Sequence, residues 1–247
     1  MLQNDLESTS MRKLLLISNS TNPGEDYLGW PQQFIREFLD KYQVKTVAFI
    51  PFAGVTVNWN DYYEKVATVF QKFNVSLLAV HQAKDMSQVL KQADAIAVGG
   101  GNTFQLVSEL QKTGLMKIIR QEALSGKPYM GWSAGSNIAC PSLKTTNDMP
   151  ITEPVSFDCM GLIPFQINPH YLDAHPSGHG GETREQRIEE FLVANPEVYV
   201  AGLREATLLE IEGNSILLKG RSAMRVFKNG IPPQELAPNS DLQFLLV

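Results

Sequence analysis

The chain has 247 residues, of which 43% are hydrophobic and 19% are charged, and its formal net charge is -5 with a pI near 5.4. An acidic balance without a long run of Lys and Arg argues against nucleic acid as a partner, because phosphate binding needs clustered basic side chains. No apolar run approaches the roughly 20 residues that cross a bilayer, and the two cysteines, Cys140 and Cys159, are too few for a disulfide framework. We therefore expect a cytoplasmic protein with no membrane partner and with reduced cysteines.

The first ten residues, MLQNDLESTS, are polar and acidic and lack the apolar centre of a signal peptide. They predict a loose extension over residues 1–10, ahead of a single domain that covers residues 11–247. No internal repeat, low-complexity tract or linker divides the rest of the chain.

Short apolar runs alternate with helical patterns through the first half of the chain. The predicted strands are Lys13–Ile17, Thr46–Pro51, Ser76–Val80, Ala95–Val98 and Pro128–Gly131. The predicted helices are Gln32–Lys41, Asn60–Phe73, Asp85–Gln92, Thr103–Gln111 and Met116–Ser125. Runs such as LLLI and AIAV are continuously apolar, which is typical of strands buried on both faces of a parallel sheet. The alternation predicts an α/β fold with a doubly wound, mainly parallel sheet flanked by helices.

Small and polar residues follow four of these strands. The four segments are Ser18–Ser20, Phe52–Gly54, Gly99–Asn102 and Trp132–Gly135. Ligands of such sheets bind beyond the carboxyl ends of the strands, so we expect the four segments to converge at one edge.

The second half of the chain has a different pattern. Six prolines interrupt residues 140–179, yet the apolar residues there favour an ordered segment that builds a site. A helix is predicted from Thr183 to Ala194, opened by a capping box of Thr183 and Gln186. Antiparallel strands are predicted after it, at Val198–Gly202, Leu208–Ile211, Ser215–Leu218 and Met224–Phe227.

A serine lies between two glycines in Gly131-Trp132-Ser133-Ala134-Gly135, which matches the G-x-S-x-G pattern. In a nucleophile elbow, small neighbours allow a strained turn from strand to helix that projects the serine hydroxyl above the sheet. Glycine and serine also mark plain turns and helix caps. The preceding buried strand and the following short helical pattern favour a nucleophile at Ser133.

Acyl transfer also needs donors for the oxyanion. The glycine run Gly99–Gly101 ends the neighbouring strand, and residues without a Cβ allow backbone N–H groups to approach a tetrahedral oxygen. We expect Gly100, Gly101 and Ala134 to form the oxyanion hole. A tight turn before a helix cap at Asn102 is the structural alternative.

Four histidines are available as the general base. His170 closes the strand-like run FQINPH and is the best candidate, whereas His81 ends an earlier strand pattern. A zinc site made of His170, Asp173, His175 and His179 is an alternative, but its spacing matches no standard ligand motif. We therefore expect neither a metal nor a cofactor.

Three carboxylates are candidates for the acid that orients the base. Glu205 follows a predicted strand and can reach the same edge, and Asp148 and Asp158 in the irregular segment compete with it. Ser133, His170 and Glu205 would give the chain order nucleophile, base, acid. This order differs from that of the α/β-hydrolases, in which the acid precedes the histidine.

Several sequence blocks, in the same order, resemble the peptidase E (aspartyl dipeptidase) family. The blocks are LLLISNST, VAFIPFAGVT, VGGGNTFQL, GWSAGSNIACP, TTNDMPI, FQINPH and GETREQRI. The resemblance implies a class I glutamine amidotransferase-like fold with a serine in place of the usual cysteine. It also implies a Ser-His-Glu triad at Ser133, His170 and Glu205. The neighbours of Glu205 depart from the family pattern, so Asp148 remains open as the acid.

Members of this family cleave dipeptides that begin with aspartate. Such a substrate needs a cation for its side-chain carboxylate, and Arg184 at the start of a predicted helix offers a bidentate guanidinium. Asn102 and Asp148 are expected to contact the substrate as well. The alternatives are a cyanophycinase-like peptidase, an α/β-hydrolase-type esterase and a ligand-binding protein without turnover. The sequence is compatible with a monomer or a homodimer.

Overall fold

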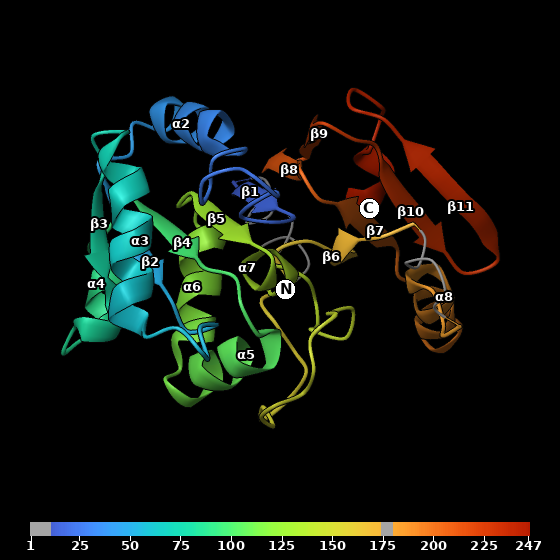
Figure 1. Cartoon of the computed structure of the whole chain (residues 1–247), viewed down its shortest axis with the longest axis horizontal. Coiled ribbons are helices and arrows are strands. Elements are labelled where there is room, and N and C mark those ends of the chain that lie inside the picture. The colour runs from blue at the N-terminus through green and yellow to red at the C-terminus, as the bar shows by residue number, and fades with distance from the viewer. Residues whose placement is uncertain (1–10, 174–179) are drawn as a thin grey trace.

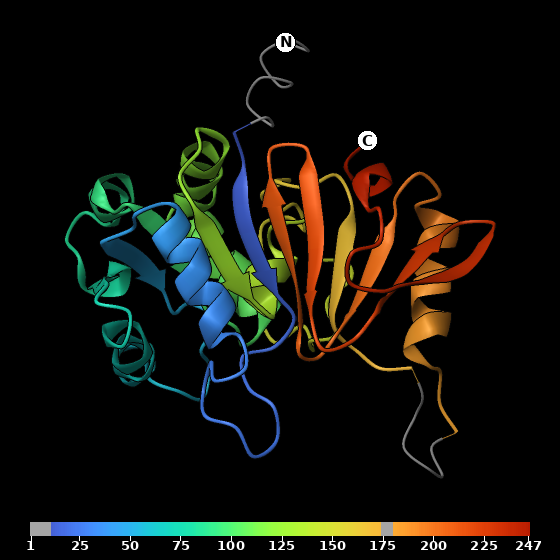
Figure 2. The same cartoon turned by 90° about the horizontal axis from the view of Figure 1, so that it is seen from above.

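Two β-sheets lie side by side in the computed structural model of this chain, which describes residues 11–173 and 180–247 (Figure 1). The extension predicted at residues 1–10 lies outside the described residues. The larger sheet has seven strands and the smaller has four. Figure 2 shows the same two sheets from above.

The seven-stranded sheet carries the predicted parallel strands. In order across the sheet, its seven strands are β3 (Ser76–Ala79), β2 (Thr46–Ile50), β4 (Ala95–Val98), β5 (Tyr129–Trp132), β1 (Lys13–Ile17), β8 (Thr207–Glu212) and β9 (Ser215–Gly220). Neighbours from β3 to β1 run parallel, whereas β8 pairs antiparallel with β1 and with β9. The apolar runs of β1, β2, β4 and β5 are almost completely buried, as expected of strands covered on both faces.

Helices cover both faces of this sheet. On one face α2 (Gln32–Lys41) and α3 (Trp59–Gln71) pack against alternate strand residues such as Leu15 and Phe49. On the other face α4 (Met86–Gln92), α5 (Thr103–Lys112) and α6 (Leu115–Leu124) pack against Leu14 and Ile96. The five predicted helices are confirmed to within two residues at each end, and the doubly wound fold is confirmed with them.

The four-stranded sheet consists of β11 (Ile231–Leu236), β10 (Met224–Lys228), β7 (Val200–Arg204) and β6 (Gln166–Tyr171), in that order. One face joins the core of the larger sheet through Ile167 and Leu203. The other face is covered by α8 (Arg184–Ala194), whose Ile188 and Leu192 contact Val200. The predicted capping box of Thr183 and Gln186 is present at the start of α8.

The sequence analysis differs from the structure of this sheet in two respects. The strand expected at Val198–Gly202 in an antiparallel set does pair antiparallel with β10, but it runs parallel to β6, because α8 carries the chain back across the sheet. The strand β11 was missed, since it contains Pro232 and Pro233. Proline is tolerated there because β11 lies at the edge of the sheet and needs only one partner strand.

The irregular segment before β6 is ordered by burial. Its residues Leu143, Met160, Leu162 and Phe165 belong to the main core, and Ser142 forms an isolated antiparallel bridge with Asp158. This packing places the loop that carries Asp148 next to the start of α5. Among the described residues no helix has the length and apolar character needed to span a membrane.

Candidate active site

Ser133 occupies the turn between β5 and the short helix α7 (Ala134–Asn137), with φ 53° and ψ −114°. This is a strained conformation for a residue that carries a Cβ. Both neighbouring glycines are required by close backbone packing. A Cβ on Gly131 would lie 2.3 Å from the Gly135 carbonyl oxygen, and a Cβ on Gly135 would lie 2.2 Å from the Val98 carbonyl oxygen. The strand–serine–helix turn expected from the motif is present.

His170 reaches Ser133 from the other sheet. Its Nε2 lies 2.9 Å from the Ser133 Oγ. His170 has φ 53°, and the register of β6 against β7 shifts between Pro169 and Tyr171. This β-bulge breaks the alternation of the strand and re-aims the imidazole, which is why a residue within a strand can face the elbow.

Glu205 completes a chain of hydrogen bonds, since its Oε1 lies 2.8 Å from the His170 Nδ1. It follows the last residue of β7, in the turn that leads to β8. The next residue, Ala206, has φ 58°, and its N–H donates to the Asn19 Oδ1 over 2.8 Å. The side chains of His170 and Glu205 are 39% and 44% exposed, so this hydrogen bond is in contact with solvent.

Ser18 and Asn19, at the end of β1, hold these residues in place. The Ser18 Oγ accepts the His170 N–H over 3.0 Å and donates to the Leu203 carbonyl oxygen over 2.7 Å. Both side chains are buried. Sequence reasoning placed this segment at the functional edge but assigned it no role, because the residues that its two side chains hold, His170, Leu203 and Ala206, lie 152 to 187 positions further along the chain.

The competing acids have other partners. The Asp148 Oδ2 accepts the Thr103 N–H over 2.7 Å and the Thr103 hydroxyl over 2.6 Å, and Asp158 lies in the bridge to Ser142. Neither contacts His170. The geometry therefore places Glu205, rather than either aspartate, against the imidazole.

Arg204, the unexpected neighbour of Glu205, has a structural role. Its guanidinium forms ion pairs with Asp173 after β6 and with Glu235 on β11. Hydrogen bonds from Arg204 lower the pKa of both carboxyls. Arg204 thus ties three strands together immediately before the turn that carries Glu205.

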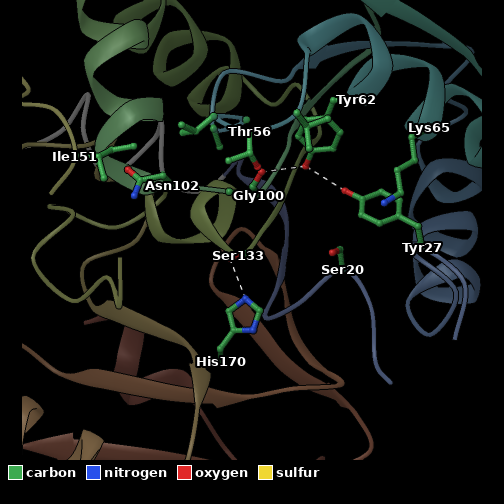
Figure 3. Close-up of a pocket in the computed structure, with 15 residues that line it drawn as sticks. Ser20, Tyr27, Thr56, Tyr62, Lys65, Gly100, Asn102, Ser133, Ile151 and His170 are labelled. Atoms are coloured by element: carbon green, nitrogen blue, oxygen red, sulfur yellow. Dashed lines mark hydrogen bonds between the residues drawn. The ribbon is translucent and has the colours of Figure 1, made fainter. Parts of the chain in front are cut away.

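A cleft of about 540 Å³ opens above Ser133 (Figure 3). It is lined by residues from all four segments predicted to converge, including Ser20, Ala53, Gly101 and Ser133. The convergence of the strand ends is therefore confirmed.

The glycine run forms one wall beside the serine. The amides of Gly99 and Asn102 donate to the carbonyl oxygens of Ile50 and Ala53, and in the described part of the chain no backbone carbonyl accepts from the two amides between them. Gly101 has φ 138°, and a Cβ there would lie 2.2 Å from the Ala53 carbonyl oxygen. The run thus presents backbone donors without a partner in the described part of the chain next to Ser133.

A group of aromatic side chains supports this wall. The Tyr62 hydroxyl donates to the Gly100 carbonyl oxygen over 3.1 Å. The Trp132 Nε1 lies 2.9 Å from the Tyr27 Oη and 3.0 Å from the Tyr62 Oη. Burial raises the pKa of both tyrosines, so both phenols stay neutral. No pattern in the sequence indicated this role, because aromatic residues on a helix are usually core residues.

Of the three expected substrate-binding residues, Asn102 lines the cleft, whereas Asp148 and Arg184 are not among its lining residues. The Asn102 side chain caps α5 through the Gln105 N–H, over 3.0 Å, and donates to the Met149 carbonyl oxygen over 2.9 Å. Asn102 thus lines the cleft and also caps α5, which was the structural alternative in the sequence analysis. Asp148 lies at the start of the same helix.

Arg184, the third, is the first residue of α8 and is half-buried. Desolvation lowers its pKa, as does the charge of Arg187, whereas the charge of Asp148 opposes the shift. No ion pair involves Arg184 among residues 11–173 and 180–247. A partly desolvated guanidinium near a carboxylate is suited to bind a second carboxylate.

The zinc alternative finds no cluster in the described ranges. Asp173 is bound to Arg204, and both ring nitrogens of His170 have partners. His175 and His179 lie outside the described residues. No cofactor is implied by the donor groups around the cleft.

Comparison with known proteins identifies the family. The sequence model of peptidase family S51 matches residues 14–219. The chain is 52% identical over 235 residues to a peptidase E from Nostoc sp., and this match covers 95% of this chain and 97% of that protein. It is 43% identical over 230 residues to a peptidase E from Pasteurella multocida, and this match covers 93% of this chain and 98% of that protein.

Solved structures agree with this comparison. A crystal structure described as a peptidase E protein from Listeria monocytogenes EGD-e matches with a TM-score of 0.63 at 26% identity, over 86% of this chain and all of that one. A peptidase from an acI-B1 Actinobacterium shares the fold, with a TM-score of 0.66 at 17% identity, over 93% of this chain and 96% of that one. The chain belongs to peptidase family S51.

Proposed function

We propose that this peptidase is a serine-type dipeptidase that hydrolyses the bond after an N-terminal aspartate. The observation that carries the proposal is the continuous hydrogen-bonded chain from the Ser133 Oγ through His170 to Glu205, beside a cleft walled by glycine amides. Nucleophile, base and orienting acid within hydrogen-bond reach of one another are the geometric signature of covalent acyl transfer.

In the acylation step, the Ser133 Oγ attacks the carbonyl carbon of the aspartyl residue while the His170 Nε2 takes the hydroxyl proton. The C–N bond then breaks, and His170 gives that proton to the leaving amine. Glu205 accepts a hydrogen bond from the Nδ1–H, which holds the required tautomer and stabilises the imidazolium. In deacylation, His170 takes a proton from water, the hydroxide displaces the Ser133 oxygen, and the proton returns to the serine.

The oxyanion formed in both steps is assigned to the amides of Gly100, Gly101 and Ala134. Ala134 is the first residue of α7, where an N–H has no partner within its own helix. Fixed donors of this kind stabilise charge that develops only in the transition state, and removal of one such donor costs about 10²–10³ in kcat.

Specificity for aspartate rests on the family resemblance and is supported by Arg184. Its guanidinium would pair with the side-chain carboxylate of the substrate, and the Asp148 carboxylate would bind the free ammonium group. Asp148 lies at the start of α5 and Arg184 is the first residue of α8, and the charge of Asp148 acts on the Arg184 guanidinium. A neutral first residue would leave the Arg184 charge unpaired in a partly desolvated position, which disfavours its binding.

The experiment is hydrolysis of Asp-Leu, Glu-Leu, Asn-Leu and Ala-Leu by the wild type, Ser133→Ala and Arg184→Met. We expect turnover of Asp-Leu alone, its loss in Ser133→Ala, and a strong increase of KM in Arg184→Met. Arg187→Met is the matched control, because Arg187 is 60% exposed and pairs with Glu182 at 3.7 Å.

Substantial activity of Ser133→Ala would remove the serine from the mechanism. Equal turnover of all four dipeptides would refute the aspartate specificity. Faster cleavage of a simple ester or of a branched aspartate-arginine polymer would favour the esterase or the cyanophycinase-like alternative.

A further inference from the structure

The cleft extends past Ser133 to an end that the proposed function leaves unused. Figure 3 shows Lys65, Tyr27 and Ser20 on one side of Ser133 and Asn102 and Ile151 on the other. We propose that the Lys65 ammonium binds a carboxylate of the leaving residue, so that the enzyme favours substrates with a negative charge after the scissile bond. This inference rests on the proposed function, because it concerns the second residue of the same substrate.

The charge of the cleft supports this role. Of the described residues that line it, Lys65 is the one lysine or arginine, and no Asp or Glu is among them. Within residues 11–173 and 180–247, Lys65 takes part in no ion pair. An anion that enters the cleft therefore meets a cation that no carboxylate of the described chain neutralises.

The position of the ammonium is fixed by an aromatic platform. The Lys65 Nζ lies 4.1 Å from the centroid of the Tyr27 ring, within the range of a cation–π contact. The Tyr27 hydroxyl is held by the Trp132 Nε1 and donates to the Tyr62 Oη over 3.0 Å. Lys65 is thus directed along the cleft wall from the exposed side of α3.

The orientation of the substrate in the cleft follows from the groups at the two ends of the cleft. The groups proposed to bind the aspartyl residue belong to the Asn102 side, where Asp148 contacts the start of α5. With that residue on one side and its carbonyl at Ser133, the leaving residue extends toward Lys65. Its anionic groups are the C-terminal carboxylate of a dipeptide and the side chain of a second Asp or Glu.

Substrates that carry or lack each carboxylate distinguish the C-terminal carboxylate from the side chain of the leaving residue. The wild type and Lys65→Met are compared on Asp-Leu, Asp-Leu-amide, Asp-Glu-amide and Asp-Gln-amide. Binding of the terminal carboxylate predicts a fall of about fivefold in kcat/KM for Asp-Leu and none for its amide, since a solvent-accessible ion pair contributes about 1 kcal/mol. Binding of the side chain predicts the same fall for Asp-Glu-amide and none for Asp-Gln-amide.

Lys72→Met is the matched control, because Lys72 is an exposed lysine at the end of the same helix, away from the cleft lining. Lys65→Arg should retain the charge-dependent rate, and the difference between charged and amidated substrates should shrink at high salt. Equal effects of Lys65→Met on all four substrates, or no effect on any, would overturn the inference while leaving the peptidase intact. A wild type that hydrolyses none of the four would overturn the proposed function, and this inference with it.

Discussion

The hydrogen bond between Glu205 and His170 makes a quantitative prediction for Glu205→Gln. The amide retains the shape of the side chain but loses the charge that stabilises the imidazolium, and its NH₂ group cannot accept the Nδ1–H. In serine peptidases with a buried aspartate this exchange lowers kcat about 10⁴-fold. Here the carboxylate is 44% exposed, so water can replace part of the lost stabilisation.

We therefore expect Glu205→Gln to lower kcat for Asp-Leu by about 10²–10³, which corresponds to about 3–4 kcal/mol of transition-state stabilisation. KM should stay within about twofold, because the carboxylate acts through His170 and not on the substrate. The assay is steady-state hydrolysis of Asp-Leu, with circular dichroism to show that the variant is folded. Asp158→Asn, which changes the competing acid in the bridge to Ser142, should leave the kinetics unchanged. A kcat of Glu205→Gln within about threefold of the wild type would refute the assignment.

Three further outcomes are expected. Tyr62→Phe removes the donor to the Gly100 carbonyl oxygen and should lower kcat about tenfold with KM nearly unchanged; an unchanged kcat in steady-state kinetics would show that the glycine wall is held without it. Gly101→Ala would place a Cβ 2.2 Å from the Ala53 carbonyl oxygen at a φ of 138°. It should lower the free energy of unfolding by about 1–3 kcal/mol, as measured by thermal unfolding, and an unaltered Tm would contradict this. Burial raises the pKa of Cys140 to about 12, so the thiol of the native protein should resist alkylation by iodoacetamide at pH 8. Peptide mapping checks this prediction, and rapid alkylation of Cys140 in the native protein would disprove it.

The sequence predicted most of the fold because its parallel strands are continuous apolar runs with clear helical patterns between them. It also predicted which strand ends meet, since the topology of such sheets brings their carboxyl ends to one edge. The smaller sheet was harder to predict. Strand direction is set there by α8, and an apolar run such as Val200–Arg204 reads the same in parallel and antiparallel pairing.

The candidate site could be predicted only where a residue's own neighbours reveal its chemistry. Ser133 stands in a motif with glycines that the turn requires, whereas Ser18 and Asn19 act through hydrogen bonds to residues more than 150 positions away. The same holds for Tyr62, whose hydroxyl reaches a carbonyl 38 positions further along. Contacts at such separations leave no periodic or local pattern in a single sequence.

The division of the hydrogen-bonded chain between the two sheets has a consequence during synthesis. The elbow belongs to the larger sheet, but the imidazole is carried by β6 and the carboxylate follows β7. A nascent chain that has emerged only through α7 contains Ser133 without its hydrogen-bond partner His170. In the proposed mechanism, hydrolysis therefore becomes possible only after β6 and β7 have docked beside the larger sheet.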